Sequence, residues 1–293
     1  MLNRNKTGLY FLDDGYAYID NSNKTKSRTV TSIFIYFLLF FVISSFIILG
    51  IQAIYMANSG FSIEITNPNS PYYNEVFTKE MTYFSSALGN FVIYLIGTIV
   101  IFCIMGYTLM NDLRALRWEK FITFVKYVFF GYVFFYIANI IASIFSMILP
   151  TEAGNEQAIV EILTTNRTNL IFMAISTIVL APILEELIFR KCFFNLFSRK
   201  FGPTMTIIFS SLLFGAIHIV NPVIEAILVT AQDPSKASLI LVEFAYLFVY
   251  SLMGVGLGMA YQYSKRNIVP VILLHMFNNF MSVMSTLLLA DMM

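Results

Sequence analysis

The side chains best suited to chemistry in this chain are two histidines and two adjacent glutamates, all inside long apolar runs. The chain of 293 residues contains 2 histidines, His218 and His275, and the adjacent acids are Glu185 and Glu186. A polar group in an apolar environment costs free energy unless it has a partner, and an ionisable group within a membrane span is a functional candidate by default. We therefore expect these four side chains to be used in one site.

The glutamates lie in the stretch Ala181-Pro-Ile-Leu-Glu-Glu-Leu-Ile-Phe-Arg190. Glu186 and Arg190 are four residues apart and share a helix face, so they can form an ion pair. Glu185 points about 100° away and is left available as a general base. Pro182 removes a backbone hydrogen bond, and such breaks accompany functional sites in membrane helices. Alternatively, these charges belong to a helix end and extend into water without a further role.

Two more motifs contain the histidines: Phe214-Gly-Ala-Ile-His218 and His275-Met-Phe-Asn-Asn279. His275 and Asn279 are four residues apart and share a helix face. A single intramembrane histidine can simply form a hydrogen bond to a neighbouring helix. A histidine and an amide on one face, beside a helix that carries two carboxylates, favour a functional site instead.

Distances along the helices predict the depth of these residues. Glu185 and His218 lie on the two arms of a hairpin whose turn contains Gly202, and each is about 25 Å from that turn at 1.5 Å per residue. The two side chains should therefore lie at the same depth. His275 lies only about 12 Å from the turn that precedes its own helix. Either the hairpin extends past the inner membrane surface, or the last helix is tilted.

The elements that position these residues are membrane-spanning helices. The composition is 58% hydrophobic and 12% charged, whereas a soluble protein of this length carries roughly 25% charged residues. About seven segments are long enough to cross a hydrocarbon core of roughly 30 Å. They are residues 29–57, 82–111, 121–149, 170–198, 203–221, 238–263 and 268–290. The sequence thus predicts an all-α polytopic membrane helical bundle.

Basic residues gather in the N-terminal arm and in alternate loops, a set that includes Arg190 and Lys191. The positive-inside rule therefore predicts the N-terminus inside and the C-terminus outside. We expect a polar cytosolic arm over residues 1–28, three transmembrane helices over 29–150 and a four-helix catalytic core over 168–293. The formal net charge of +1 gives no indication of nucleic-acid binding. The 2 cysteines provide neither a disulfide framework nor a metal-binding spacing.

Two stretches have structural interpretations. Residues 222–230 are apolar but too short to span the membrane, which predicts a half-helix or a surface-lying piece. Gly254, Gly256 and Gly258 lie on a predicted span, and glycines at four-residue spacing allow helices to approach closely. We interpret these glycines as packing residues.

The three motifs together resemble those of the CPBP family, also known as the Abi family. This family comprises membrane-embedded CAAX-processing endopeptidases and bacteriocin-processing or immunity proteins. Its pattern is Glu-Glu-x-x-x-Arg, then Phe-x-x-x-His, then His-x-x-x-Asn, and all three parts occur here in order. The resemblance covers about residues 168–290 and uses both histidines, whereas residues 1–150 contribute nothing to it.

The resemblance implies an integral membrane endopeptidase of the glutamate type in a prokaryotic cell membrane, with no cofactor. Glu185 would activate a water that His218 helps to orient. His275 and Asn279 would stabilise the oxyanion of the tetrahedral intermediate. The remaining motif residues would support the shape of the site, and they are Glu186, Arg190 and Phe214. The substrate would be a membrane-associated peptide or lipidated protein, such as a CAAX-like tail, a peptide pheromone or a bacteriocin precursor.

Three alternatives stay open. A zinc ion could bind at Glu185, His218 and His275, although the spacing is not the His-Glu-x-x-His of zinc peptidases. The chain could be a non-proteolytic bacteriocin-immunity or regulatory membrane protein of the same fold, in which the polar cluster is a structural network. It could also be a proton- or ion-coupled transporter that uses the intramembrane acids and histidines as relay groups. The absence of paired broken helices argues against the transporter.

Overall fold

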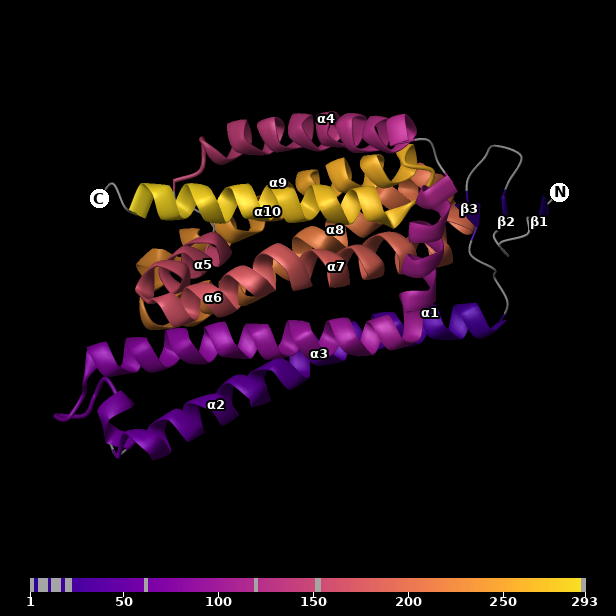
Figure 1. Ribbon diagram of the computed structural model, residues 1–293. Coiled ribbons are helices and arrows are strands. Elements are labelled where there is room, and N and C mark those ends of the chain that lie inside the picture. The colour runs from indigo at the N-terminus through magenta and orange to yellow at the C-terminus, as the bar shows by residue number, and fades with distance from the viewer. Residues whose placement is uncertain are drawn as a thin grey trace.

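The computed structural model of the protein is a bundle of long helices with three very short strands near the N-terminus (Figure 1). The residues that it describes are 3–4, 10–11, 17–18, 23–60, 63–118, 121–150 and 154–290. Within them, 7 helical stretches are long and apolar enough to cross a membrane. The predicted all-α, multi-span fold is therefore confirmed, and the protein is an integral multi-pass membrane protein.

The three strands are β1 (Asn3–Arg4), β2 (Tyr10–Phe11) and β3 (Ala17–Tyr18). They form one antiparallel sheet in the order β1-β2-β3. Most other residues of the N-terminal arm lie outside the described part of the chain. The cytosolic location of the arm therefore stays a prediction.

The first three spans consist of α1 to α4. The first span is one continuous helix of three pieces: α1 (Asn23–Leu38), the π-helical η1 (Leu39–Ile43) and α2 (Ser44–Ser59). It is followed by the short 3-10 helix η2 (Ile63–Thr66), α3 (Glu75–Trp118) and α4 (Phe121–Ser146).

The C-terminal part begins with α5 (Gly154–Thr165), which no sequence pattern predicted. The helix that carries the glutamates then consists of α6 (Arg167–Ile175), η3 (Ser176–Leu180), α7 (Ala181–Glu186) and η4 (Leu187–Cys192), with η3 and η4 π-helical. It continues into α8 (Phe193–Gln232), whose two helical parts are separated by a sharp turn at Gly202. After α8 come η5 (Pro234–Lys236), α9 (Ser238–Tyr263) and α10 (Ile268–Ala290). The sequence missed α5 because its 12 residues are too short and too polar to read as a span.

The candidate spans coincide with the predicted segments, and several are longer. The clearest difference concerns residues 222–230, for which the expectation of a half-helix or a surface piece is wrong. Here α8 continues through Pro222 to its end at Gln232. A proline removes one backbone donor, but the neighbouring turns stay helical, and Ile219 packs in a buried cluster with Val242 and Tyr246 of α9.

Glycines allow α9 to approach two other helices. A Cβ added at Gly254 would lie 3.0 Å from the Cα of Ser211 on α8, and one added at Gly256 would lie 2.8 Å from the Cα of Phe135 on α4. At Gly258 the nearest atom, again on α8, would be 3.1 Å away. The predicted packing role of these glycines is confirmed.

The N-terminal spans pack directly on the helix that carries the glutamates. In Figure 1, α9 and α10 lie between α4 on one side and α7 and α8 on the other, with α3 and α2 beyond them. One cluster of buried apolar residues includes Tyr36 of α1, Ile101 of α3 and Leu184 of α7. The N-terminal strands and the α9–α10 turn lie at one end of the bundle, and α5 and the C-terminus lie at the other.

Candidate active site

Glu185 and Glu186 end α7, a six-residue helix between the π-helical segments η3 and η4. Pro182 lies in the first turn of α7 and cannot donate a backbone hydrogen bond. A π-helical turn contains one extra residue and is frequently found at functional sites. The backbone break predicted from Pro182 is present. Its π-helical form was not predictable, because hydrophobic periodicity does not reveal a single inserted residue.

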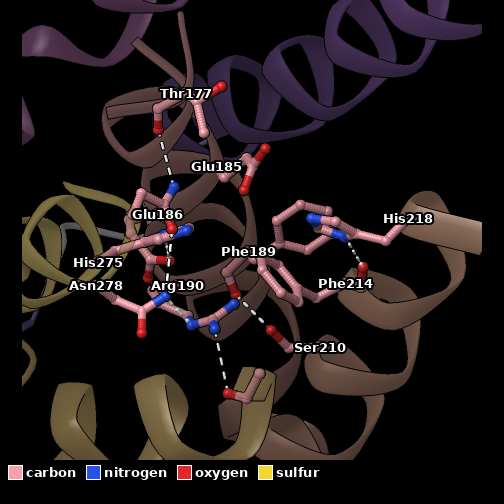
Figure 2. Close-up of polar contacts among 12 residues, drawn as sticks. Thr177, Glu185, Glu186, Phe189, Arg190, Ser210, Phe214, His218, His275 and Asn278 are labelled. Carbon is pink, nitrogen blue, oxygen red and sulfur yellow. Dashed lines mark hydrogen bonds and ion pairs between the residues drawn. The ribbon is translucent and has the colours of Figure 1, made fainter. Parts of the chain in front are cut away.

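Glu186 is the centre of a buried charged network (Figure 2). Its Oε2 lies 3.2 Å from Nε of Arg190, and neither side chain is exposed. Arg190 also donates from Nη2 to the carbonyl of Gly254 on α9, at 3.1 Å. The predicted ion pair therefore forms, and the alternative of a helix end that extends into water is wrong.

His275 joins this network from α10. Its Nδ1 lies 2.9 Å from Oε1 of Glu186. Because a carboxylate oxygen accepts a hydrogen bond, Nδ1 is the donor in this contact. Nε2 is the ring nitrogen that remains for another partner. The sequence paired His275 with Asn279 alone, since helical spacing does not reveal which face of α10 meets α7.

Glu185 has a different environment. Its side chain is buried, with 3% exposed, and its Oε1 accepts a hydrogen bond from the hydroxyl of Tyr94 on α3 at 3.0 Å. Its charge also acts on the phenol of Tyr36 on α1. Neither tyrosine belongs to the three motifs, and no sequence signal pointed to them.

His218 lies on α8, on the side of Glu185 opposite Glu186 and His275 in Figure 2. Its Nδ1 is 2.7 Å from the carbonyl oxygen of Phe214, so Nδ1 is the donor and a neutral ring keeps Nε2 as an acceptor. Its ring stacks on Tyr250 of α9, with the centroids 4.9 Å apart. Glu185 is close enough to His218 to act electrostatically on its ring.

Phe214 packs at the centre of the site. Its ring centroid lies 4.6 Å from that of His218 and 6.0 Å from that of His275. The guanidinium of Arg190 lies over the same ring at 5.2 Å. Phe214 thus separates the two imidazoles and covers the buried cation, which explains why a phenyl group precedes His218 by four residues.

Asn279 lies one turn beyond His275 and contacts η3. Its Nδ2 donates to the carbonyl of Thr177 at 2.8 Å, and its Oδ1 accepts from Asn278 at 3.3 Å. An amide nitrogen has two protons, so one is left for a further acceptor. The four predicted catalytic residues thus come from α7, α8 and α10, and these helices meet at one site.

The α9–α10 turn explains the depth of His275. In this turn the backbone carbonyl of Arg266 accepts a hydrogen bond from Nζ of Lys191 at 3.0 Å. The guanidinium of Arg266 donates to the hydroxyl of Ser198 at 3.1 Å. The turn therefore lies beside the glutamate-bearing arm, before the hairpin turn at Gly202, where φ is 76°. The hairpin turn thus extends beyond the α9–α10 turn, and its extension past the inner membrane surface stays a prediction.

Two basic residues that we counted with the inner loops are buried. Arg190 pairs with Glu186, and Nζ of Lys191 lies 2.6 Å from Oδ2 of Asp112 on α3. The same Asp112 oxygen accepts from the backbone N–H of Ile268 at 2.7 Å. This second buried network joins α3, η4 and α10. Arg190 and Lys191 are therefore no longer counted among the basic residues of the inner loops. The orientation of the chain in the membrane stays a prediction.

The possible metal ligands have other partners. Nδ1 of each histidine is bonded within the protein. Across the described part of the chain, no group of three or more His, Cys, Asp or Glu side chains is arranged to hold a metal ion. Zinc at Glu185, His218 and His275 stays an untested alternative, as does the expectation of no cofactor.

The fold and site together define a class: a multi-span membrane protein with buried carboxylates, two imidazoles and an amide on the neighbouring helices α7, α8 and α10. Such groups can take a proton from water and stabilise a negative oxygen. Residues 167–281 match the family described as "Type II CAAX prenyl endopeptidase Rce1-like". This match confirms the resemblance to the CPBP family that the three motifs predicted.

One curated relative points the same way. The chain is 27% identical over 133 residues to "Putative membrane peptidase YdiL" of Bacillus subtilis (strain 168). The aligned part covers 45% of this chain and 43% of the relative, so the chain spans less than half of the relative's length. No solved structure matches the chain. Both comparisons connect the chain with membrane peptidases, and the family match lies in its C-terminal helices.

Proposed function

We propose that the protein is an intramembrane endopeptidase of the glutamate type, with Glu185 as the general base. The observation that carries this proposal is the contrast between the adjacent acids. Glu186 is held by Arg190 and His275, whereas the hydrogen bond of Glu185 comes from an uncharged hydroxyl. One carboxylate is thus committed to structure, and its neighbour keeps its capacity to accept a proton.

In the proposed reaction, Glu185 takes a proton from a water whose other proton is directed toward Nε2 of His218. The water oxygen attacks the scissile carbonyl carbon, and the carbonyl electrons move to its oxygen. When the tetrahedral intermediate collapses, the carbon–nitrogen bond breaks. The proton held by Glu185 then passes to the leaving amine, and the two peptides are released.

His275 and Asn279 are the proposed oxyanion donors. A donor at Nε2 requires the His275 ring to carry both protons, because Nδ1 already donates to Glu186. The remaining Nδ2 proton of Asn279 supplies the second donor. In a site that excludes water, the loss of one such donor lowers the rate about 100- to 1000-fold.

The description of the matching family and the location of the site among the spans support a proposal for the substrate class. A membrane-associated peptide or a lipidated protein can present its scissile bond among the spans. We favour a prenylated CAAX-like tail, since this is the substrate named in the description of the matching family. A peptide pheromone or a bacteriocin precursor would be processed by the same chemistry.

The membrane peptidome of cells that express the wild type or Glu185→Ala tests the proposal and identifies the substrate. We expect at least one membrane peptide to accumulate uncleaved in the variant. Glu80→Ala, which removes an exposed carboxylate of α3, is the control and should match the wild type. Identical peptidomes for all three proteins, at equal protein levels, would contradict proteolysis and favour an immunity or regulatory role.

The proposed reaction uses no metal ion. Dialysis against 1,10-phenanthroline should leave proteolysis unchanged, and elemental analysis of the purified protein should show less than one zinc per chain. A loss of activity that stoichiometric zinc restores would instead support the zinc site at Glu185, His218 and His275.

A further inference from the structure

One face of α3 contacts the glutamate-bearing helix, although α3 lies outside the segment that matches the peptidase family. Tyr94 bonds Glu185, as described above. A Cβ added at Gly97 would lie 2.9 Å from a leucine side chain of α7, and Thr98 donates to a backbone carbonyl of η3 at 3.5 Å. Residues three and four apart lie on one helix face. The face that carries Tyr94 is therefore fixed against α7.

Aromatic side chains hold the Tyr94 ring in place. Phe40 of η1 packs edge-to-face on it, with the centroids 4.8 Å apart. Phe40 packs in turn on Tyr36 at 4.6 Å, and Tyr36 lies 5.7 Å from Phe189 of η4. Contacts of this geometry stabilise ring orientations. The direction of the Tyr94 hydroxyl is thus set by the packing of the first span and α3 on η4.

Glu185 needs such a partner. A glutamate side chain has several rotatable bonds, and holding it in one rotamer costs conformational entropy. Glu186 is held by a cation and an imidazole, but Glu185 is held by Tyr94. A hydrogen bond to a carboxylate is stronger than one between neutral groups, and more so where water is excluded. The bond uses Oε1 and leaves Oε2 to meet a water.

We infer that Tyr94 is a positioning residue for Glu185: its hydroxyl holds the carboxylate in the orientation in which it meets the reacting water. This inference rests on the proposed function and extends the site into the N-terminal spans. It implies that the matched segment alone does not form the complete site.

Tyr94→Phe tests the inference because it removes the hydroxyl and keeps the ring. Tyr107→Phe is the matched control: it lies on the same helix, and its buried hydroxyl has no hydrogen-bond partner among the described residues. The first measurement needs no substrate. Infrared difference spectra of Tyr94→Phe against wild type should show a changed carboxyl band. This difference in the carboxyl band should disappear when Tyr94→Phe is introduced into Glu185→Gln. It should also be missing from the difference spectrum of Tyr107→Phe.

The second measurement is turnover of an internally quenched peptide that ends in a farnesylated CAAX motif. Tyr94→Phe should lower kcat about 10- to 100-fold, the range for a lost hydrogen bond to a charged group, and leave KM unchanged. Glu185→Asp shortens the side chain by one methylene and should break its contact with Tyr94. In that background, adding Tyr94→Phe should lower kcat less than about twofold, because coupled residues are not additive.

The outcomes separate the two proposals. A carboxyl band that does not change, or that changes equally with Glu185→Gln present, overturns the role of Tyr94. A changed band without a fall in kcat, or a fall that Tyr107→Phe reproduces, also overturns it. A wild type that does not cleave the probe contradicts the proposed substrate class, and the band alone then decides whether Tyr94 holds Glu185.

Discussion

Glu185 and Glu186 are neighbours in the chain, yet their side chains have different partners. A buried ion pair is a weak source of stability, but removing one partner leaves an uncompensated charge. Arg190 would be left in that state without Glu186. The loss of the Glu185 charge would leave no cation without its partner, since the hydrogen bond of Glu185 comes from Tyr94. Substitution of Glu186 should therefore lower stability, whereas substitution of Glu185 should lower activity.

The first prediction compares the two amide variants. Glu186→Gln should lower the free energy of unfolding by about 3–5 kcal/mol, the range for one partner lost from a buried pair. Glu185→Gln should change it by less than about 1 kcal/mol, because the amide keeps the volume and can still accept from Tyr94. Unfolding of the purified protein in mixed micelles of detergent and dodecyl sulfate measures both. Equal losses would identify Glu185 as structural and favour the non-proteolytic alternative.

At this scale the sequence predicted the Glu186–Arg190 pair because helical spacing fixes which residues of one helix meet. It did not predict the contact between His275 and Glu186 or the one between Tyr94 and Glu185. Both contacts join different helices, and their relative rotation depends on packing rather than spacing. Tyr94 lacked any signal, since a tyrosine in a chain with 17 of them and 30 phenylalanines is not distinctive.

The helices themselves are positioned by small residues. A Cβ at Gly256 would meet the backbone of α4 at 2.8 Å, a distance that no side-chain rotation can relieve. Gly50 on α2 has nothing within 4 Å of its added Cβ and has ordinary helical φ. The two glycines share a residue type and a helical conformation but differ in what surrounds them.

The second prediction follows from this pair. Gly256→Ala should force α9 away from α4 and lower the free energy of unfolding by about 1–3 kcal/mol, the usual effect of overpacking. Gly50→Ala should leave it unchanged or raise it slightly, because alanine favours a helix by up to about 1 kcal/mol over glycine. The same micelle unfolding assay compares them. A destabilised Gly50→Ala would show that helix packing around α2 is tighter than its surroundings indicate.

Element positions were predictable because a membrane span needs a minimum apolar length. Residues 222–230 were misjudged because they were taken alone as a piece too short to span, whereas they continue the preceding helix, in which Ile219 and Ala226 are buried. The π-helical segments and α5 had no sequence signal of that kind. A π-helical segment adds only a single residue to a turn, and α5 is too short to cross a membrane.

Across the whole molecule, a second buried network connects the N-terminal spans with the C-terminal helices. Asp112 of α3 binds Lys191 of η4 and the first backbone N–H of α10. Asp112→Asn should lower the free energy of unfolding by about 3–5 kcal/mol, since Lys191 would remain buried without its counter-charge. Glu75→Gln removes a partner of an exposed pair, in which Lys79 is 60% exposed, and should have no measurable effect. An exposed-pair effect as large as that of Asp112→Asn would contradict the role of burial.

The orientation of the molecule is the last prediction, and it depends on loop charges. With Arg190 and Lys191 buried, the N-terminal arm and the alternate loops still hold most of the remaining bases, so the N-terminus should be inside. The N-terminal strands and the α9–α10 turn lie at the same end of the bundle, opposite the C-terminus. In a Cys103→Ala background, Lys79→Cys should react with a membrane-impermeant maleimide in intact cells. Lys200→Cys should react only after permeabilisation, and the reverse pattern would place the C-terminus inside.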